Sequence, residues 1–274
     1  MKVAFCLTGL VDNEKSTIAG LEELSISQHM DFFCHTWDND KNPGKDIINN
    51  FNFVNTATST YQEFEDHILE KNIANVLYNE SRSKKEIRHF FRTHMAQFYS
   101  TIKCVDMALS HDSSYDLIIK ARSNLRFEKS LCGQLSKNLN DQTLPILNRE
   151  PSAWRHFQQP NSDDRPNTQW DHWPECVKDI QVVFVPATHY PIWKNYTPFM
   201  DTMFAMERSF AYDHILQENF LGNILQKFLY FARHSDTLAM EADKVWHKYL
   251  MDNNVAIYGF PVETWMHRDE KIII

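Results

Sequence analysis

Short apolar runs alternate with amphipathic stretches along the first half of the chain. Val3–Leu7 and Met30–Cys34 are apolar runs typical of strands buried on both faces of a parallel sheet. Between them, apolar residues of Ser16–Leu24 recur at helical spacing. A third run, Tyr115–Ala121, has the same apolar character. We therefore expect Val3–Leu7, Asp31–Cys34 and Tyr115–Ala121 to be neighbouring parallel strands of one sheet.

The strongest helical pattern precedes the third run. From about Lys85 to Ser110, apolar residues recur at steps of three and four and form one continuous stripe. A helix of this kind can make the crossover that parallel strands need. In the second half, Phe210–Arg233 is broadly apolar and Thr237–Met251 is amphipathic, so this part should be richer in helix. Further strands are expected at Leu144–Leu147, Val182–Val185 and Val255–Phe260.

Strands that alternate with helices predict an α/β fold. The sheet should be mostly parallel and flanked by helices, in the Rossmann-like manner, with a helical C-terminal part. No internal repeat, low-complexity segment or Gly/Ser linker interrupts the 274 residues. A single domain over residues 1–274 is therefore expected.

The composition narrows the classes of partner. Hydrophobic residues make up 43% and aromatic residues 13% of the chain, which predicts a folded globular protein. A net charge of −8 without a basic stripe argues against nucleic acid as a partner. No apolar stretch is long enough to span a membrane. The five scattered cysteines include no CxxC pair, which favours reduced thiols and a cytoplasmic location.

The glycines exclude two common phosphate-binding motifs. Only six are present, and neither GxGxxG nor a P-loop can be built from them. A bound phosphate would then need side-chain cations, a metal ion or a helix N-terminus.

Charge appears abruptly at the end of the Tyr115–Ala121 run. Lys120, Arg122 and Asn124 alternate with smaller residues, so they should lie on one face of the strand. Ligands of open α/β sheets bind outside the carboxyl ends of strands, which makes this position a candidate site. The alternative is a strand that simply reaches the surface and continues as a loop.

Several short motifs follow one another in a fixed order. They are Thr8-Gly9 after the first strand, Asp31–Trp37 over the second, Gln97–Ser100 with Lys103 in the long helix, Tyr115–Leu125, Asp201–Met206 and Glu241–Leu250. In these motifs the chain resembles small glycosyltransferase-like proteins of the GT-A type, which occur in bacteria and large viruses. The resemblance covers most of the chain. It implies a GT-A-like fold and the transfer of a sugar from a nucleotide-sugar donor to a glycan or other small acceptor.

The resemblance also implies roles for individual residues. Residues 1–130 would form a nucleotide-binding half and residues 131–274 an acceptor-side half. Asp201 is expected to act as general base or to orient the acceptor hydroxyl, and Glu241 is a second candidate. The expected donor-binding residues are Thr8, Gly9, the turn formed by His35, Thr36 and Trp37, and then Lys103, Lys120, Arg122 and Asn124.

Two residues depart from the family pattern. Lys120 stands where the family usually has arginine, which keeps the charge but loses the bidentate fork. Asn124 stands where the family usually has an aspartate that helps to hold a divalent metal ion. As a metal ligand, Asn124 brings no charge, so Mn²⁺ or Mg²⁺ should bind weakly. A catalytically inactive nucleotide- or glycan-binding protein, or a scaffold of the same fold, is therefore the alternative.

The segment Glu150–Glu175 is rich in aromatic residues but has no clear periodicity. One interpretation is a surface loop that tucks into a small core of its own. The other is a lid or acceptor platform in which Trp154, Trp170 or Trp173 packs on a sugar ring.

Overall fold

A seven-stranded sheet with the strand order β3-β2-β1-β4-β7-β6-β8 forms the centre of the protein. The computed structural model describes residues 2–10, 14–27, 30–38, 44–70, 94–123, 125–126, 181–186, 203–234, 242–253, 255–260 and 265–266. The strands of the sheet are β1 (Val3–Thr8), β2 (Met30–Trp37), β3 (Asn55–Ser59), β4 (Leu117–Arg122), β6 (Val182–Pro186), β7 (Met203–Glu207) and β8 (Ala256–Phe260).

Most neighbouring strands run in parallel. β1 pairs with β2 on one side and with β4 on the other, and Val3 lies opposite Met30 and Leu117. β2 and β3 are also parallel, as are β6 and β8. Only β7 among these strands runs against its neighbours β4 and β6. The prediction that the first three apolar runs form neighbouring parallel strands is therefore confirmed.

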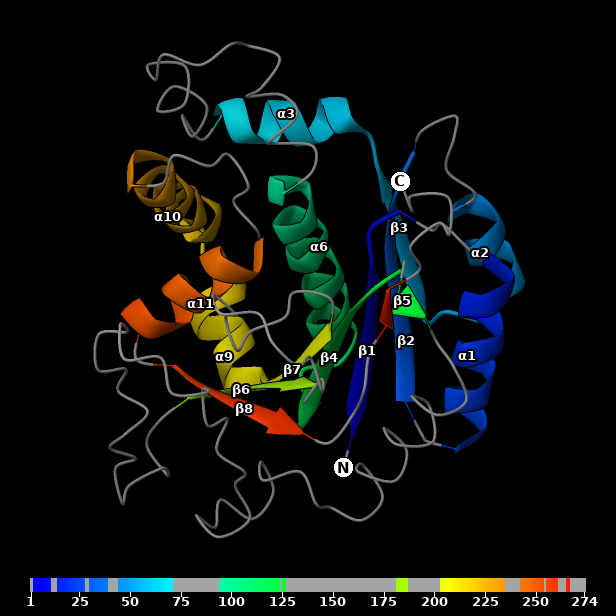
Figure 1. Ribbon diagram of the computed structural model, residues 1–274. Helices are drawn as coiled ribbons and strands as arrows, with labels where there is room; N and C mark the ends of the chain where they lie inside the picture. The colour runs from blue at the N-terminus through cyan, green and yellow to red at the C-terminus, as the bar shows by residue number, and fades with distance from the viewer. Residues whose placement is uncertain are drawn as a thin grey trace, which may run out of the picture.

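Helices cover both faces of the sheet (Figure 1). One face carries α1 (Glu14–Ser27) and α2 (Gly44–Asn50). The opposite face carries α6 (Ala96–His111), α10 (Phe220–His234) and α11 (Ala242–Asp252), with α3 (Tyr61–Glu70) near the start of α6. The α/β class and the helical C-terminal part are thus confirmed. The sheet takes strands from both halves of the chain.

Short elements complete the described structure. β5 (Leu125–Arg126) and β9 (Trp265–Met266) form a separate two-stranded sheet. The apolar stretch from Phe210 to Arg233 is interrupted, since α9 (Arg208–Phe210) and the π-helix η5 (Ala211–Ile215) precede α10. The expected strand at 144–147 lies outside the described residues, as does the long helix before residue 94.

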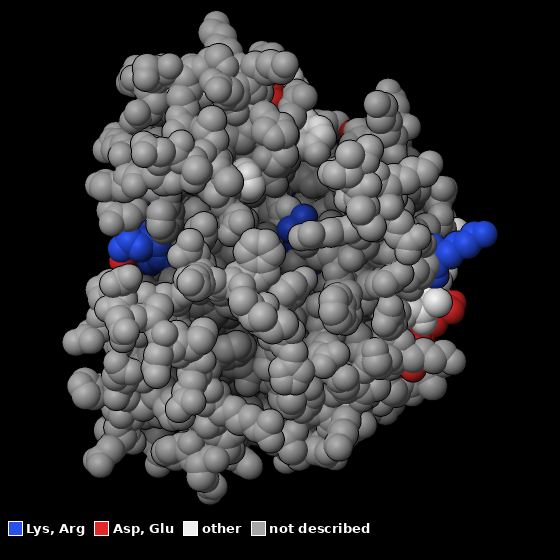
Figure 2. Space-filling model, viewed as in Figure 1, with Lys and Arg blue, Asp and Glu red and all other residues white. Residues whose placement is uncertain are grey.

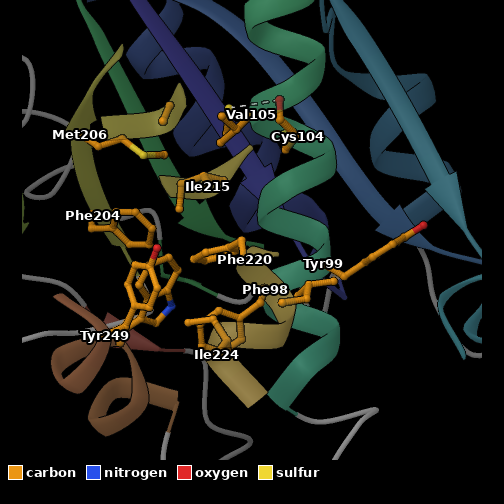
Figure 3. Close-up of a cluster of buried hydrophobic side chains, with 14 of the residues drawn as sticks. Phe98, Tyr99, Cys104, Val105, Phe204, Met206, Ile215, Phe220, Ile224 and Tyr249 are labelled. Atoms are coloured by element: carbon orange, nitrogen blue, oxygen red, sulfur yellow. Dashed lines mark hydrogen bonds between the residues drawn. The ribbon is translucent and has the colours of Figure 1, made fainter. Parts of the chain in front are cut away.

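The core on the α6 face joins the helices to the sheet. Phe98 of α6 stacks on Trp246 of α11 with ring centroids 4.9 Å apart, and the Trp246 ring also meets Phe204 of β7. Figure 3 shows Phe98 and Phe220 converging between α6 and α10, while Tyr99 points the other way. Met95, Phe98, Val105 and Leu109 of the apolar stripe predicted for this helix lie in the core that joins α6 to α10, α11 and the sheet.

Among the described helices, none combines the length and the apolar character that crossing a membrane would require.

Candidate functional site

The ends of β1, β2 and β4 bring three predicted site residues to one edge of the sheet. Thr8 lies in register with His35 of β2 and with Arg122 of β4. Residues in register on parallel strands share a face, and the His35 ring contacts Ser100 of α6, so this is the face that α6 covers. We call this part of the molecule, where β1, β2 and β4 end, the carboxyl edge. The strand register thus places Thr8, His35 and Arg122 side by side at this edge.

His35 is fully buried, and serines bind both of its ring nitrogens. Nδ1 lies 2.5 Å from the Ser100 hydroxyl, and Nε2 lies 3.0 Å from the Ser59 hydroxyl at the end of β3. Burial of the ring, together with the nearby positive charge of Lys103, lowers the pKa of His35 to about 4. The imidazole is therefore neutral at physiological pH. It joins α6 to β2 and β3 and is a weak base, so this geometry suits positioning better than proton transfer.

Thr36 and Trp37 are also engaged inside the protein. The end of the apolar run predicts a turn at His35–Trp37, but β2 continues to Trp37. The Thr36 hydroxyl donates to the Gly9 carbonyl at 3.1 Å, and the Trp37 ring stacks on Tyr61 with centroids 4.8 Å apart. Polar residues continue this strand because their side chains find partners within the fold. A direct contact of these side chains with a donor stays a prediction.

A sharp turn follows β1 at the carboxyl edge. Gly9 has a φ of +104°, a backbone conformation that residues with a Cβ rarely adopt. A Cβ there would lie 3.5 Å from the Ser123 hydroxyl oxygen, which is an ordinary contact. The backbone conformation, and not a lack of space, therefore requires glycine. The turn is fixed to β2 because the Gly9 amide donates to the His35 carbonyl at 3.1 Å.

The three expected cations differ in exposure. Arg122, at the end of β4, is partly exposed, and so is Lys103, whose ammonium lies 5.3 Å from the centre of the Tyr99 ring. Lys120 is only 1% exposed, and its ammonium lies 5.5 Å from the centre of the Phe204 ring. Figure 2 shows basic atoms recessed in the middle of the visible face. Of these three cations, Arg122 and Lys103 are the ones that solvent reaches.

The remaining predicted residues lie outside the described part of the chain. They are Asn124, Trp154, Trp170, Trp173, Asp201 and Glu241. The described chain resumes two residues after Asp201, at Met203, which begins β7 and pairs with Ala121 of β4. Within the described residues, no group of three or more His, Cys, Asp or Glu side chains could hold a metal ion.

Sequence reasoning assigned no role to three serines that organise this edge. Ser59 and Ser100 hold His35, and the Ser123 hydroxyl donates to the carbonyl of Leu10. Serine readily bonds to nearby polar groups at the ends of strands and in turns. Ser100 and Ser123 lie within motifs of the resemblance, and Ser59 ends a strand, but a serine in such a place is too common to indicate a site by itself.

No protein-family model matches the chain, and no curated protein matches its sequence. Among solved structures, the chain is similar to a protein of Desulfovibrio desulfuricans described as a nucleotide-diphospho-sugar transferase. The identity is 6%, the coverage is 95% of this chain and 79% of that chain, and the TM-score is 0.38. Mouse xyloside xylosyltransferase 1 is similar at 11% identity, with coverage of 95% and 85% and a TM-score of 0.41. The glycosyltransferase GlyE of Streptococcus pneumoniae is similar at 8% identity and a TM-score of 0.36, over 93% of this chain and 45% of that one.

Proposed function

We propose that this protein transfers a sugar from a nucleotide-sugar donor to an acceptor hydroxyl. The observation that carries the proposal is the in-register placement of Thr8 and Arg122 at the carboxyl edge, with Lys103 nearby on α6. Ligands of open α/β sheets bind at such an edge, and cations there match the charge of a diphosphate. The sequence resemblance to GT-A type glycosyltransferases supports the same function.

The proposed reaction exchanges one bond at the anomeric carbon for another. The bond from this carbon to the diphosphate oxygen breaks with its electron pair on the leaving diphosphate. The acceptor oxygen forms the new bond and loses its proton to a base. Arg122 and Lys103 stabilise the negative charge that develops on the leaving group. Asp201 is the proposed base or hydroxyl-orienting group, Glu241 is the second candidate, and the tryptophans of Glu150–Glu175 are proposed to border the acceptor.

The test has two stages. The first stage is a thermal-shift measurement with a panel of nucleoside diphosphates. If the carboxyl edge binds a donor, at least one of these ligands should raise the melting temperature of the protein. A donor-hydrolysis assay, with and without Mn²⁺, should then detect release of the nucleoside diphosphate. No thermal shift with any nucleotide would contradict the proposal and favour a scaffold. Binding without hydrolysis or transfer would favour the catalytically inactive binding protein, which Asn124 makes the second candidate.

We expect donor binding to depend little on a metal ion, because Asn124 supplies no negative charge. Titration calorimetry with a nucleoside diphosphate should give affinities within about twofold of each other in Mn²⁺ and in chelator. The variant Asn124→Asp should gain a clear Mn²⁺ dependence, since a carboxylate adds an anionic oxygen ligand. The matched control is the native protein titrated with Mn²⁺ alone. Strong metal dependence in the native protein would refute this prediction and restore a metal-assisted mechanism.

A further inference from the structure

The turn after β1 is held from both sides by hydroxyl groups of the neighbouring strands. On the β2 side, the Thr36 hydroxyl donates to the carbonyl of Gly9. On the β4 side, the Ser123 hydroxyl donates to the carbonyl of Leu10. Two successive carbonyls of one turn therefore accept hydrogen bonds from two different strand ends. This arrangement fixes where the turn lies relative to both strands.

Ser123 makes hydrogen bonds beyond the one that pairs it with β1. Its amide donates to the Thr8 carbonyl at 2.9 Å and extends the β1–β4 ladder by one residue. Its own carbonyl accepts from the Thr17 hydroxyl of α1 at 3.3 Å. With its side chain bound to Leu10, this one residue connects β1, the turn and α1. It is 2% exposed, so water does not replace these bonds.

The position of Ser123 in the sequence gives these contacts a consequence for the site. Ser123 directly follows Arg122, the cation at the end of β4, and it lies opposite the Thr8-Gly9 turn. Anchoring the backbone at Ser123 therefore fixes both the base of the Arg122 side chain and the turn across from it. Binding sites need such preorganisation, because misplacement by a fraction of an ångström already weakens contacts to a ligand.

We propose that Ser123 is a positioning residue of the donor site, and that its hydroxyl holds the Gly9–Leu10 turn and the Arg122 strand end in the geometry that receives the diphosphate. The proposal rests on the function proposed above. Ser123 does not need to contact the donor itself, because it acts through Arg122 and the turn.

Two variants and one control test the role of the hydroxyl. Ser123→Ala removes the hydroxyl, and Ser123→Thr retains it. Thr101→Ala is the control, because the Thr101 hydroxyl is equally buried and also donates to a backbone carbonyl, that of Gln97, at 2.9 Å. All variants are compared by thermal melting, so that loss of stability is separated from loss of affinity.

Titration calorimetry is performed with uridine, guanosine, cytidine and adenosine diphosphates, and the tightest ligand is used for the comparison. Ser123→Ala should bind it about tenfold more weakly, as expected for the loss of one positioning hydrogen bond. Ser123→Thr should recover most of the affinity, and Thr101→Ala should stay within about twofold of the native protein. Native affinity in Ser123→Ala, an equal loss in Thr101→Ala, or no recovery in Ser123→Thr would overturn the proposal.

Hydrogen exchange gives a readout that needs no ligand. The Gly9 amide should exchange faster in Ser123→Ala than in the native protein, and it should be unaffected in Thr101→Ala, because only the former loosens the turn. Unchanged exchange at Gly9 would refute the positioning role even if no nucleotide binds. Absence of nucleotide binding by the native protein, with faster exchange in Ser123→Ala, would refute the proposed function and leave the anchoring of the turn supported.

Discussion

Acidification from neutral pH to about pH 4 is expected to lower the free energy of unfolding by about 3 kcal/mol through His35 alone. In the folded protein the pKa of His35 is about 4 and not 6.5, mainly because the ring is buried and also because Lys103 lies nearby. The unfolded chain therefore binds a proton below pH 6.5 that the folded protein binds only near pH 4. This contribution of His35 to the free energy of unfolding is complete above pH 6.5. It falls as the pH is lowered from 6.5 to about 4, and it is gone below that.

Chemical denaturation across this pH range measures the effect in the native protein and in His35→Gln. The glutamine is neutral at every pH, so the variant should start less stable and lose less stability on acidification. His111→Gln is the matched control, because His111 lies exposed at the end of α6. This control should keep the native pH dependence. Parallel pH profiles for the native protein and His35→Gln would show that His35 is not the cause.

Replacement of Arg122 by alanine should weaken binding of a nucleoside diphosphate by about 1.5–3 kcal/mol, the range for a charge-assisted hydrogen bond. The dissociation constant would rise about tenfold to a hundredfold. Arg122→Lys should lose less, because it keeps the charge but not the bidentate geometry. The loss should shrink at high salt, where the charge is screened. Titration calorimetry at two ionic strengths measures all three effects.

Arg208→Ala provides the control for this measurement. Arg208 is exposed and directly follows Glu207, the last residue of β7. Glu207 pairs with Leu117 at the start of β4, so Arg208 lies at the opposite end of β4 from Arg122. Its guanidinium donates to the Ser113 carbonyl at 2.6 Å. This variant loses the same charge but should keep the native affinity. Native affinity in a correctly folded Arg122→Ala protein would remove Arg122 from the proposed site.

The buried strands could be predicted because their chemistry is local. β1, β2 and β4 are apolar runs, and the parallel arrangement follows from the helices between them. β3 could not be predicted in this way. Its sequence Asn-Thr-Ala-Thr-Ser is polar. β3 is the outermost strand and has a neighbour, β2, on one side only, so it does not need the apolar run of a central strand.

The candidate site could be predicted only in part, because strand patterns give the register of the strands but not the partners of their polar side chains. The register of three strands places Thr8, His35 and Arg122 on one edge, and strand patterns are enough to expect this. Whether a polar side chain at that edge faces solvent or a partner depends on residues far away in the sequence. His35 is buried because Ser59 and Ser100 reach it from β3 and α6. Such tertiary hydrogen bonds leave no periodic signal in the sequence.

The path of α6 couples two regions that are distant in the sequence. Phe98 stacks on Trp246 of the C-terminal helix, and two residues later Ser100 binds His35. A single rigid helix thus carries a core contact on one side and the anchor of the carboxyl edge on the other. Substitutions that alter the packing around Trp246 would consequently shift Ser100 and disturb its hydrogen bond to His35.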